Sequence, residues 1–145
     1  MNWDETFLYN MRYKKFISSK NVLTTLLDSG TDAMVDNVFE MDFYANLYGE
    51  IYVKPYYNAG SNNSEHSTYI TNILEDGKTI ISKTDELKFG ASGSPELLIE
   101  VKPSRKYTIH IERPIKGYQA KLSKIEILGD VIDNKELYIT KLGGE

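Results

Sequence analysis

The sequence predicts an all-β protein made of two antiparallel sheets that pack as a β-sandwich. Two observations predict this fold class. Apolar and polar residues alternate along most of the chain from Phe39 onward, and turn signals recur about every 8–12 residues. About eight or nine strands fit this pattern. Because a single sheet of that many strands would leave one apolar face in water, two packed sheets are favoured.

One segment departs from the two-residue alternation and favours a helix. Ser19 is a suitable N-cap, and Gly30 stands where a helix would end. Between them four apolar side chains recur at helical spacing: Val22, Leu23, Leu26 and Leu27. We therefore expect one short helix near residues 20–28.

Residues 1–18 precede this helix and are interpreted as an N-terminal docking segment. Alternation over Phe7, Tyr9, Met11 and Tyr13 favours a strand, whereas Trp3, Phe7 and Met11 also recur at helical spacing. The rest of the chain, residues 19–145, contains no repeat, low-complexity tract or Pro/Gly-rich linker. It is interpreted as a single β-sandwich domain.

The first strands of this domain follow from alternation and turn residues. Two strands are expected at residues 39–45 and 51–56, with a turn at Leu47-Tyr48-Gly49 between them. A polar loop follows at residues 58–67. Two further strands flank Asp76-Gly77, a residue pair typical of a tight hairpin because both positions favour positive φ.

The second half of the domain continues the same pattern. Strands are expected at residues 97–101 and 107–111, on either side of a turn that contains Pro103. In the next run, residues 118–127, the inward parity changes near Ser123-Lys124, which is typical of a bulge. A last strand is expected around Leu137 and Ile139.

Charge is distributed unevenly along the chain, although the formal net charge is only −4. Residues 21–53 hold six acids and no lysine or arginine, and residues 101–125 hold seven bases against Glu112 alone. These segments either lie side by side and neutralise each other, or lie on opposite faces and promote docking between copies. The negative net charge argues against nucleic acid as a partner.

Several chemistries are excluded by what the sequence lacks. With no cysteine, disulfides, thiolate metal sites and cysteine nucleophiles are ruled out. The two histidines, His66 and His110, have no metal-binding spacing, and no nucleophile or phosphate-loop motif occurs. We therefore expect no metal, no cofactor, no catalytic residue and no enzymatic activity. A catalytic pair of carboxylates that meets only in the folded chain is not excluded by the sequence. No apolar run reaches the roughly 18 residues of a membrane span, and no secretory signal is recognised at the start.

Tyrosine is the most informative residue type in this composition. The chain has eleven tyrosines, and six of them lie between residues 44 and 69. Tyr44, Tyr52 and Tyr56 share the outward parity of their strands. Outward aromatic side chains suit a protein interface or stacking on sugar rings, and filling of the core is the alternative. These three tyrosines are the candidate surface for a glycan or a protein partner.

The run from Tyr118 to Asp130, YQAKLSKIEILGD, resembles the penultimate strands of jelly-roll sandwiches such as galactose-binding-like and carbohydrate-binding modules. This resemblance implies a jelly-roll-like sandwich and carries over no binding residue. The whole chain also resembles small virion accessory proteins of tailed bacteriophages. It shares with them a short, cysteine-free chain rich in Lys, Asn, Ile and Tyr, one sandwich and an N-terminal segment that could dock. That resemblance implies a virion protein assembled in the host cytoplasm.

The sequence thus supports two functional hypotheses. The first is a non-enzymatic structural protein of a multi-copy particle, such as a phage tail, baseplate, neck or head decoration. It would bury Trp3, Phe7, Leu8 and Met11 against another virion protein or a second copy. The second is a carbohydrate-binding module that recognises cell-surface glycans through the outward tyrosines and the loop at residues 58–67. Neither hypothesis involves nucleic acid, a membrane or a cofactor.

Overall fold

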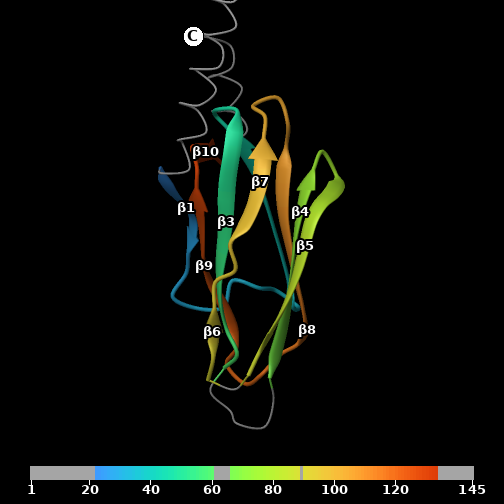
Figure 1. The fold of residues 1–145 in the computed structure, drawn as a ribbon. Coiled ribbons are helices and arrows are strands. Elements are labelled where there is room, and N and C mark those ends of the chain that lie inside the picture. The colour runs from blue at the N-terminus through green and yellow to red at the C-terminus, as the bar shows by residue number, and fades with distance from the viewer. Residues whose placement is uncertain (1–21, 61–65, 89, 134–145) are drawn as a thin grey trace, which may run out of the picture.

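The computed structural model describes residues 22–60, 66–88 and 90–133. These residues form ten β-strands and no helix, arranged as two antiparallel five-stranded sheets that pack face to face (Figure 1). The predicted all-β sandwich is confirmed. Two strands of only two residues each bring the number slightly above the expectation. No helix in the described ranges is long and apolar enough to cross a membrane.

Each sheet is named here after its central strand. The β3 sheet contains β1 (Leu23–Asp28), β9 (Lys121–Leu128), β3 (Gly49–Asn58), β7 (Leu97–Val101) and β6 (Ser92–Gly93). Both β7 and β6 pair with β3, at different levels along it. The β8 sheet has the order β10 (Val131–Ile132), β2 (Val38–Ala45), β8 (Tyr107–Ile115), β4 (Ser67–Glu75) and β5 (Lys78–Leu87).

The order of the strands is that of a jelly roll. Without the two-residue strands β6 and β10, the sheets read β1-β9-β3-β7 and β2-β8-β4-β5. Strands from the beginning and the end of the chain are therefore neighbours in both sheets, as in a sandwich built from two Greek keys. The jelly-roll-like topology expected from the resemblance is confirmed.

The helix predicted near residues 20–28 is wrong, because Leu23–Asp28 form β1, an edge strand paired with β9. A bulge explains the misleading pattern. The register shifts between Thr25 and Leu27, so that Leu26 is an extra residue in the strand. Leu26 and Leu27 consequently both pack against the core, whereas Leu23 is 56% exposed. A bulged strand has thus imitated the apolar spacing of a helix.

Two other local predictions are confirmed. Asp76 and Gly77 connect β4 to β5 with φ angles of 47° and 87°, the positive values that a type I′ turn requires. In β9 the register against β3 skips Ser123, which is therefore the extra residue of the expected bulge.

Aromatic side chains fill much of the space between the sheets. The rings of Tyr57 and Tyr69 stack at 4.0 Å, and those of Phe43 and Tyr107 stack at 5.4 Å. All four are buried. Burial raises the pKa of the Tyr57 hydroxyl, which also hydrogen-bonds to Thr71. For Tyr57 and Tyr69 the core-filling alternative therefore holds.

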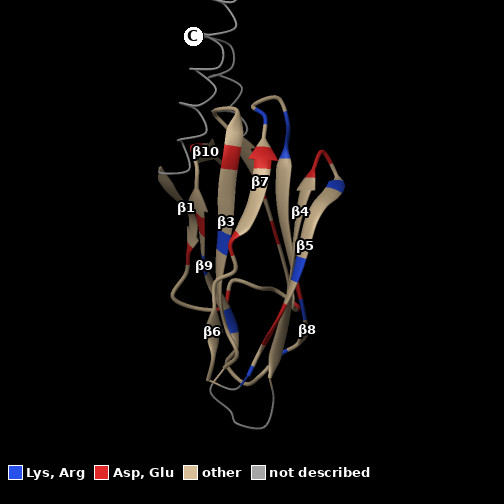
Figure 2. Cartoon of the chain, in the orientation of Figure 1, with Lys and Arg blue, Asp and Glu red and all other residues tan. Residues whose placement is uncertain are grey.

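The acidic and basic segments lie side by side. The strands β1 and β2 of the acidic segment pair with β9 and β8 of the basic segment, and acidic and basic positions occur on neighbouring strands (Figure 2). The closest link is Arg113, whose side chain is only 2% exposed. Its NH1 and NH2 groups donate to the two carboxylate oxygens of Asp32 over 3.1 and 2.7 Å. Asp32 and Arg113 therefore neutralise each other, because a buried charge requires such a partner.

Some predicted features lie outside the described residues. They are the docking segment at residues 1–18 with its interface side chains Trp3, Phe7, Leu8 and Met11, and the last strand at Leu137 and Ile139. These features stay predictions, as does the division into a docking segment and one domain.

Candidate functional site

Tyr44, Tyr52 and Tyr56, the three tyrosines predicted to face outward, do not form one surface. Tyr52 and Tyr56 lie on the outer face of β3, because alternate side chains of a strand share a face. Tyr44 belongs to β2 in the other sheet and is 6% exposed. The turn between β2 and β3 carries the chain from one sheet to the other, so residue parity is not preserved across it. The structure therefore places Tyr52 and Tyr56 on one face, with Lys54 between them, and places Tyr44 in the other sheet.

A frame of paired charges holds the half-buried ring of Tyr56. Its hydroxyl donates a hydrogen bond to Glu126, and the ammonium groups of Lys54 and Lys124 lie 5.9 and 5.5 Å from the ring centroid. Each lysine also has a carboxylate partner, Glu126 at 2.8 Å from Lys124 and Glu96 at 3.5 Å from Lys54. The register between β3 and β9 explains the frame, since Tyr56 faces Lys124 and Lys54 faces Glu126.

The contacts within this frame shift the pKa values of Glu126 and Lys124. The hydrogen bond from Lys124, helped by that from Tyr56, lowers the pKa of Glu126. The same contact raises the pKa of Lys124. Both groups are therefore charged near neutral pH, and the two oxygens of Glu126 are already bound. This carboxylate is a structural acceptor rather than a general base.

Pairing along one side of β3 is interrupted beside Tyr56. The strand β7 pairs with residues 49–53 of β3, and β6 pairs with Tyr57 and Asn58. Residues 54–56 have no strand neighbour on that side within the described part of the chain. Pro55 stands in the middle of this stretch and has no N–H group to leave unpaired. The outer face contains a shallow open hollow of about 280 Å³ at the β6 end of this interruption.

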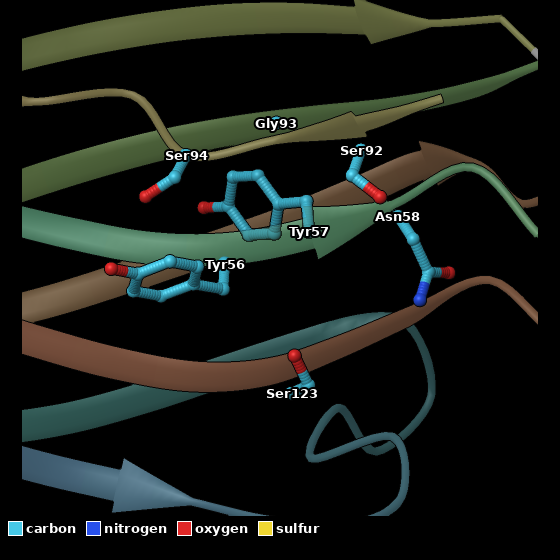
Figure 3. A pocket seen from close by; sticks show the side chains of 7 residues that line it. All are labelled: Tyr56, Tyr57, Asn58, Ser92, Gly93, Ser94 and Ser123. Atoms are coloured by element: carbon cyan, nitrogen blue, oxygen red, sulfur yellow. The ribbon is translucent and has the colours of Figure 1, made fainter. Parts of the chain in front are cut away.

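The hollow is lined mainly by uncharged polar side chains (Figure 3). The lining residues are Tyr56, Tyr57, Asn58, Ser92, Gly93, Ser94 and Ser123. None of them is charged. Tyr57 directs its hydroxyl toward Thr71 in the core, so it contributes no polar group to the hollow.

The hydroxyls of Ser92 and Ser123 and the carboxamide of Asn58 supply the polar side-chain groups that the hollow can present to a ligand. The β9 bulge places Ser123 there, and β6 places Ser92 opposite Asn58. Oδ1 of Asn58 accepts the N–H of Lys121 over 3.1 Å. Oγ of Ser94 is buried and has no hydrogen-bond partner among the described residues. The arrangement suits a ligand that both donates and accepts hydrogen bonds and carries no charge.

The histidines do not belong to this site. His110 lies on the outer face of the β8 sheet, where its Nδ1 is 2.9 Å from Glu40 and its Nε2 is 3.2 Å from Glu112. His66 is exposed beside the polar loop. Across the described ranges, no group of three or more His, Cys, Asp or Glu side chains is placed to hold a metal ion.

Most of the hollow was missed by reasoning from the sequence. The sequence pattern predicts Asn58 in the polar loop at residues 58–67, whereas the structure places it at the end of β3. The chain offered two usable signals, the bulge predicted at Ser123 and a proline inside the run of β3. Both mark places where sheet pairing is disturbed and a depression can form.

Comparison with known proteins adds information on the fold alone. No family model matches the chain, and no curated protein matches it significantly. Dimeric latent PorU from Porphyromonas gingivalis is similar at a TM-score of 0.50 with 11% identity; the match covers 72% of this chain and only 12% of the PorU chain. A family 35 carbohydrate-binding module from Clostridium thermocellum has a TM-score of 0.48 with 8% identity, covering 74% of this chain and 88% of the module. The C-terminal domain of EclA, a sugar-binding protein, has a TM-score of 0.42 with 10% identity, covering 77% and 76%.

Proposed function

We propose that this protein binds a glycan through the hollow beside Tyr56 and performs no chemistry on it. One observation carries the proposal. A rigidly held aromatic ring borders an open hollow whose polar groups are hydroxyls and an amide, and the surrounding charges are paired with one another. The proposal does not rest on the structural similarity to sugar-binding proteins.

The chemistry of the hollow matches that of an uncharged sugar. A pyranose ring presents C–H groups on its faces and hydroxyls at its rim. The body of a tyrosine ring can bury the C–H groups, while Asn58, Ser92 and Ser123 exchange hydrogen bonds with the hydroxyls. A charged ligand would instead have to displace Glu126 or Glu96 from the lysines that they bind.

The size of the hollow favours one sugar unit of a longer chain. Pockets that enclose small ligands usually measure about 300–1,000 Å³, and this hollow lies just below that range and is open. An open hollow on a sheet face leaves both neighbours of the bound unit free to continue along the surface. Because the Glu126 hydrogen bond already orients Tyr56, binding requires little ordering of that side chain.

The test is to replace Tyr56 by alanine and to measure binding on a glycan array, followed by calorimetric titration with the best ligand. Removing the stacking surface should weaken binding about tenfold or more, the loss expected for an aromatic anchor worth at least 1–2 kcal/mol. Tyr56→Phe keeps the ring and loses only the bond to Glu126, so it should stay within about threefold of the unmodified protein.

Tyr48→Ala is the matched control for loss of a tyrosine. Tyr48 is 49% exposed and precedes Gly49, the end of β3 remote from Asn58. Its replacement should leave binding unchanged. Equal weakening by Tyr48→Ala and Tyr56→Ala, or silence of the full chain on a broad array, would rule out the proposed site.

The assembly role and the virion location that the sequence favours stay predictions, and so does the absence of enzymatic activity.

A further inference from the structure

A groove separate from the glycan hollow lies between the β5 and β7 edges of the two sheets, which contact each other on one side of the sandwich (Figure 1). Its volume is about 300 Å³. Ile80 is 44% and Leu98 is 42% exposed, so apolar surface reaches the solvent on both sides of the groove. The lining residues are Glu75, Ile80, Ile81, Leu98, Ile99 and Glu100.

The strand β7 presents an open edge to this groove. Among the described strands it pairs only with β3, so N–H and C=O groups along its other side can bind a further strand. Its pairing with β3 shows no register shift. The strand contains no proline, and its inward positions are all apolar. It therefore has none of the bulges, prolines or inward charges that usually hinder strand addition.

The β5 edge across the groove is protected over part of its length. Opposite Thr71 and Tyr69 its inward positions hold charged residues, Lys83 and Asp85. The register against β4 also skips Ile80, which marks a bulge. Inward charges and bulges both hinder the addition of a strand. A further strand therefore pairs more readily with β7 than with β5.

The groove has an acidic border. Glu100 faces Glu50 directly across the β3–β7 pair, and like charges in this position are unfavourable. Glu75, on the other side, accepts a hydrogen bond from Tyr107. No ion pair between described residues includes any of these three carboxylates. The border therefore favours a ligand that brings positive charge.

An extended peptide segment of another protein fits these features. Its backbone can continue the β3 sheet beyond β7, in the way that open sheet edges accept peptide strands. Its side chains then alternate between two faces, so that one set fills the groove and the other lies beside Glu100 and Leu98. A second copy that paired through the same edge would instead bring the acidic border against itself.

We propose that the β7 edge and its groove bind an extended segment of a partner protein in which apolar residues alternate with lysine or arginine. The apolar side chains lie in the groove against Ile81 and Ile99. The basic side chains meet Glu100 and cover Leu98 with their aliphatic stems. This interaction does not depend on glycan binding, because the groove and the hollow share no lining residue.

The probe is a blocked heptapeptide of alternating lysine and valine, titrated into the isotope-labelled full chain and followed by NMR. We expect saturable shifts of the backbone amides of Ile81, Leu98, Ile99 and Glu100. One control peptide alternates glutamate with valine, and the other alternates lysine with serine. Each lacks one of the two required features, so each should bind at least about tenfold more weakly.

Backbone methylation distinguishes strand addition from simple charge attraction. Alternate residues of a strand direct their N–H and C=O groups to opposite sides, so a peptide bound to one edge uses only one of these sets. Two further peptides carry N-methyl groups on all lysines or on all valines. One of them should lose binding, and the other should stay within about threefold of the parent peptide.

Two variants of the chain test the two halves of the surface. Glu100→Lys should weaken binding of the lysine–valine peptide about fivefold, and Leu98→Thr about threefold. The matched controls are Glu86→Lys, near the other end of β5, and Leu23→Thr, on the edge strand β1. Both controls should leave binding unchanged.

Four outcomes would overturn the proposal. They are no binding of the lysine–valine peptide, equal weakening by Glu100→Lys and Glu86→Lys, an equal response to the two methylated peptides, and shifts centred on another surface. Self-association of the peptide-free chain in analytical ultracentrifugation, abolished by Leu98→Thr, would also overturn it and assign the groove to a second copy.

Discussion

His110 is the residue whose proton controls a cluster on the outer face of the β8 sheet. Its two ring nitrogens contact Glu40 and Glu112, and its side chain is 27% exposed. The hydrogen bond with Glu40 raises the pKa of His110, with a further contribution from Glu112 and against the effect of burial. The unfolded value is about 6.5. The contribution of this cluster to stability is therefore fully present below about pH 6.5. It is lost as the pH rises through the folded pKa of His110.

We expect Glu40→Gln to lower the pKa of His110, because the main partner of the imidazolium loses its charge. A titration of the His110 ring by NMR measures the shift. Asp42→Asn is the control, because it removes the same charge from the same strand. Asp42 accepts a hydrogen bond from Thr108 over 2.8 Å. A His110 pKa that responds equally to both changes would show a general charge effect instead of a specific contact.

The tyrosines show which residue-level predictions are possible from sequence. Alternation within β3 correctly placed Tyr52 and Tyr56 on one face. It could not relate them to Tyr44, because parity is defined only within a strand and the β2–β3 turn changes sheets. The bulge at Ser123 was predictable because a change of parity is visible in the sequence of one strand.

At the scale of elements, the β4–β5 hairpin depends on the conformation of Gly77. Its φ is 87°, and a Cβ added there would meet nothing within 4 Å. Any effect of Gly77→Ala therefore reports backbone strain and not a steric clash. We expect it to lower the free energy of unfolding by about 1–2 kcal/mol in urea denaturation.

Gly30→Ala is the matched control for the hairpin. Gly30 also has open space around it, and its φ is not in the left-handed region. Its replacement should be neutral or stabilise the protein by about 0.4–1 kcal/mol, because alanine restricts the unfolded chain. A similar loss of unfolding free energy in both variants would show that the positive φ of Gly77 does not determine the stability of this turn.

Elements differ in how far their sequence determines them. The Asp76-Gly77 hairpin was predictable because its signal is local. The sequence of β1 predicts a helix because its bulge yields helical spacing, and only pairing with β9 shows that it is a strand. The hollow was not predictable, since Asn58 and Ser92 meet through pairing of segments that are distant in the chain.

At the scale of the whole molecule, the jelly-roll order gives each sheet an outer face and, among the described strands, leaves edge strands at both ends of the β3 sheet. The glycan hollow lies on the outer face of the β3 sheet, where the β6 and β7 pairings are interrupted. A second groove lies between the β5 and β7 edges and shares no lining residue with the hollow.

The central claim, glycan binding in the hollow beside Tyr56, is tested most directly by an NMR titration of the isotope-labelled full chain with neutral oligosaccharides. We expect the backbone amides of Tyr57, Asn58, Ser92, Gly93 and Ser123 to shift in a saturable way, and those of the β4–β5 hairpin to stay unchanged. Shifts centred on another surface, or none with any sugar of a broad panel, would contradict the claim.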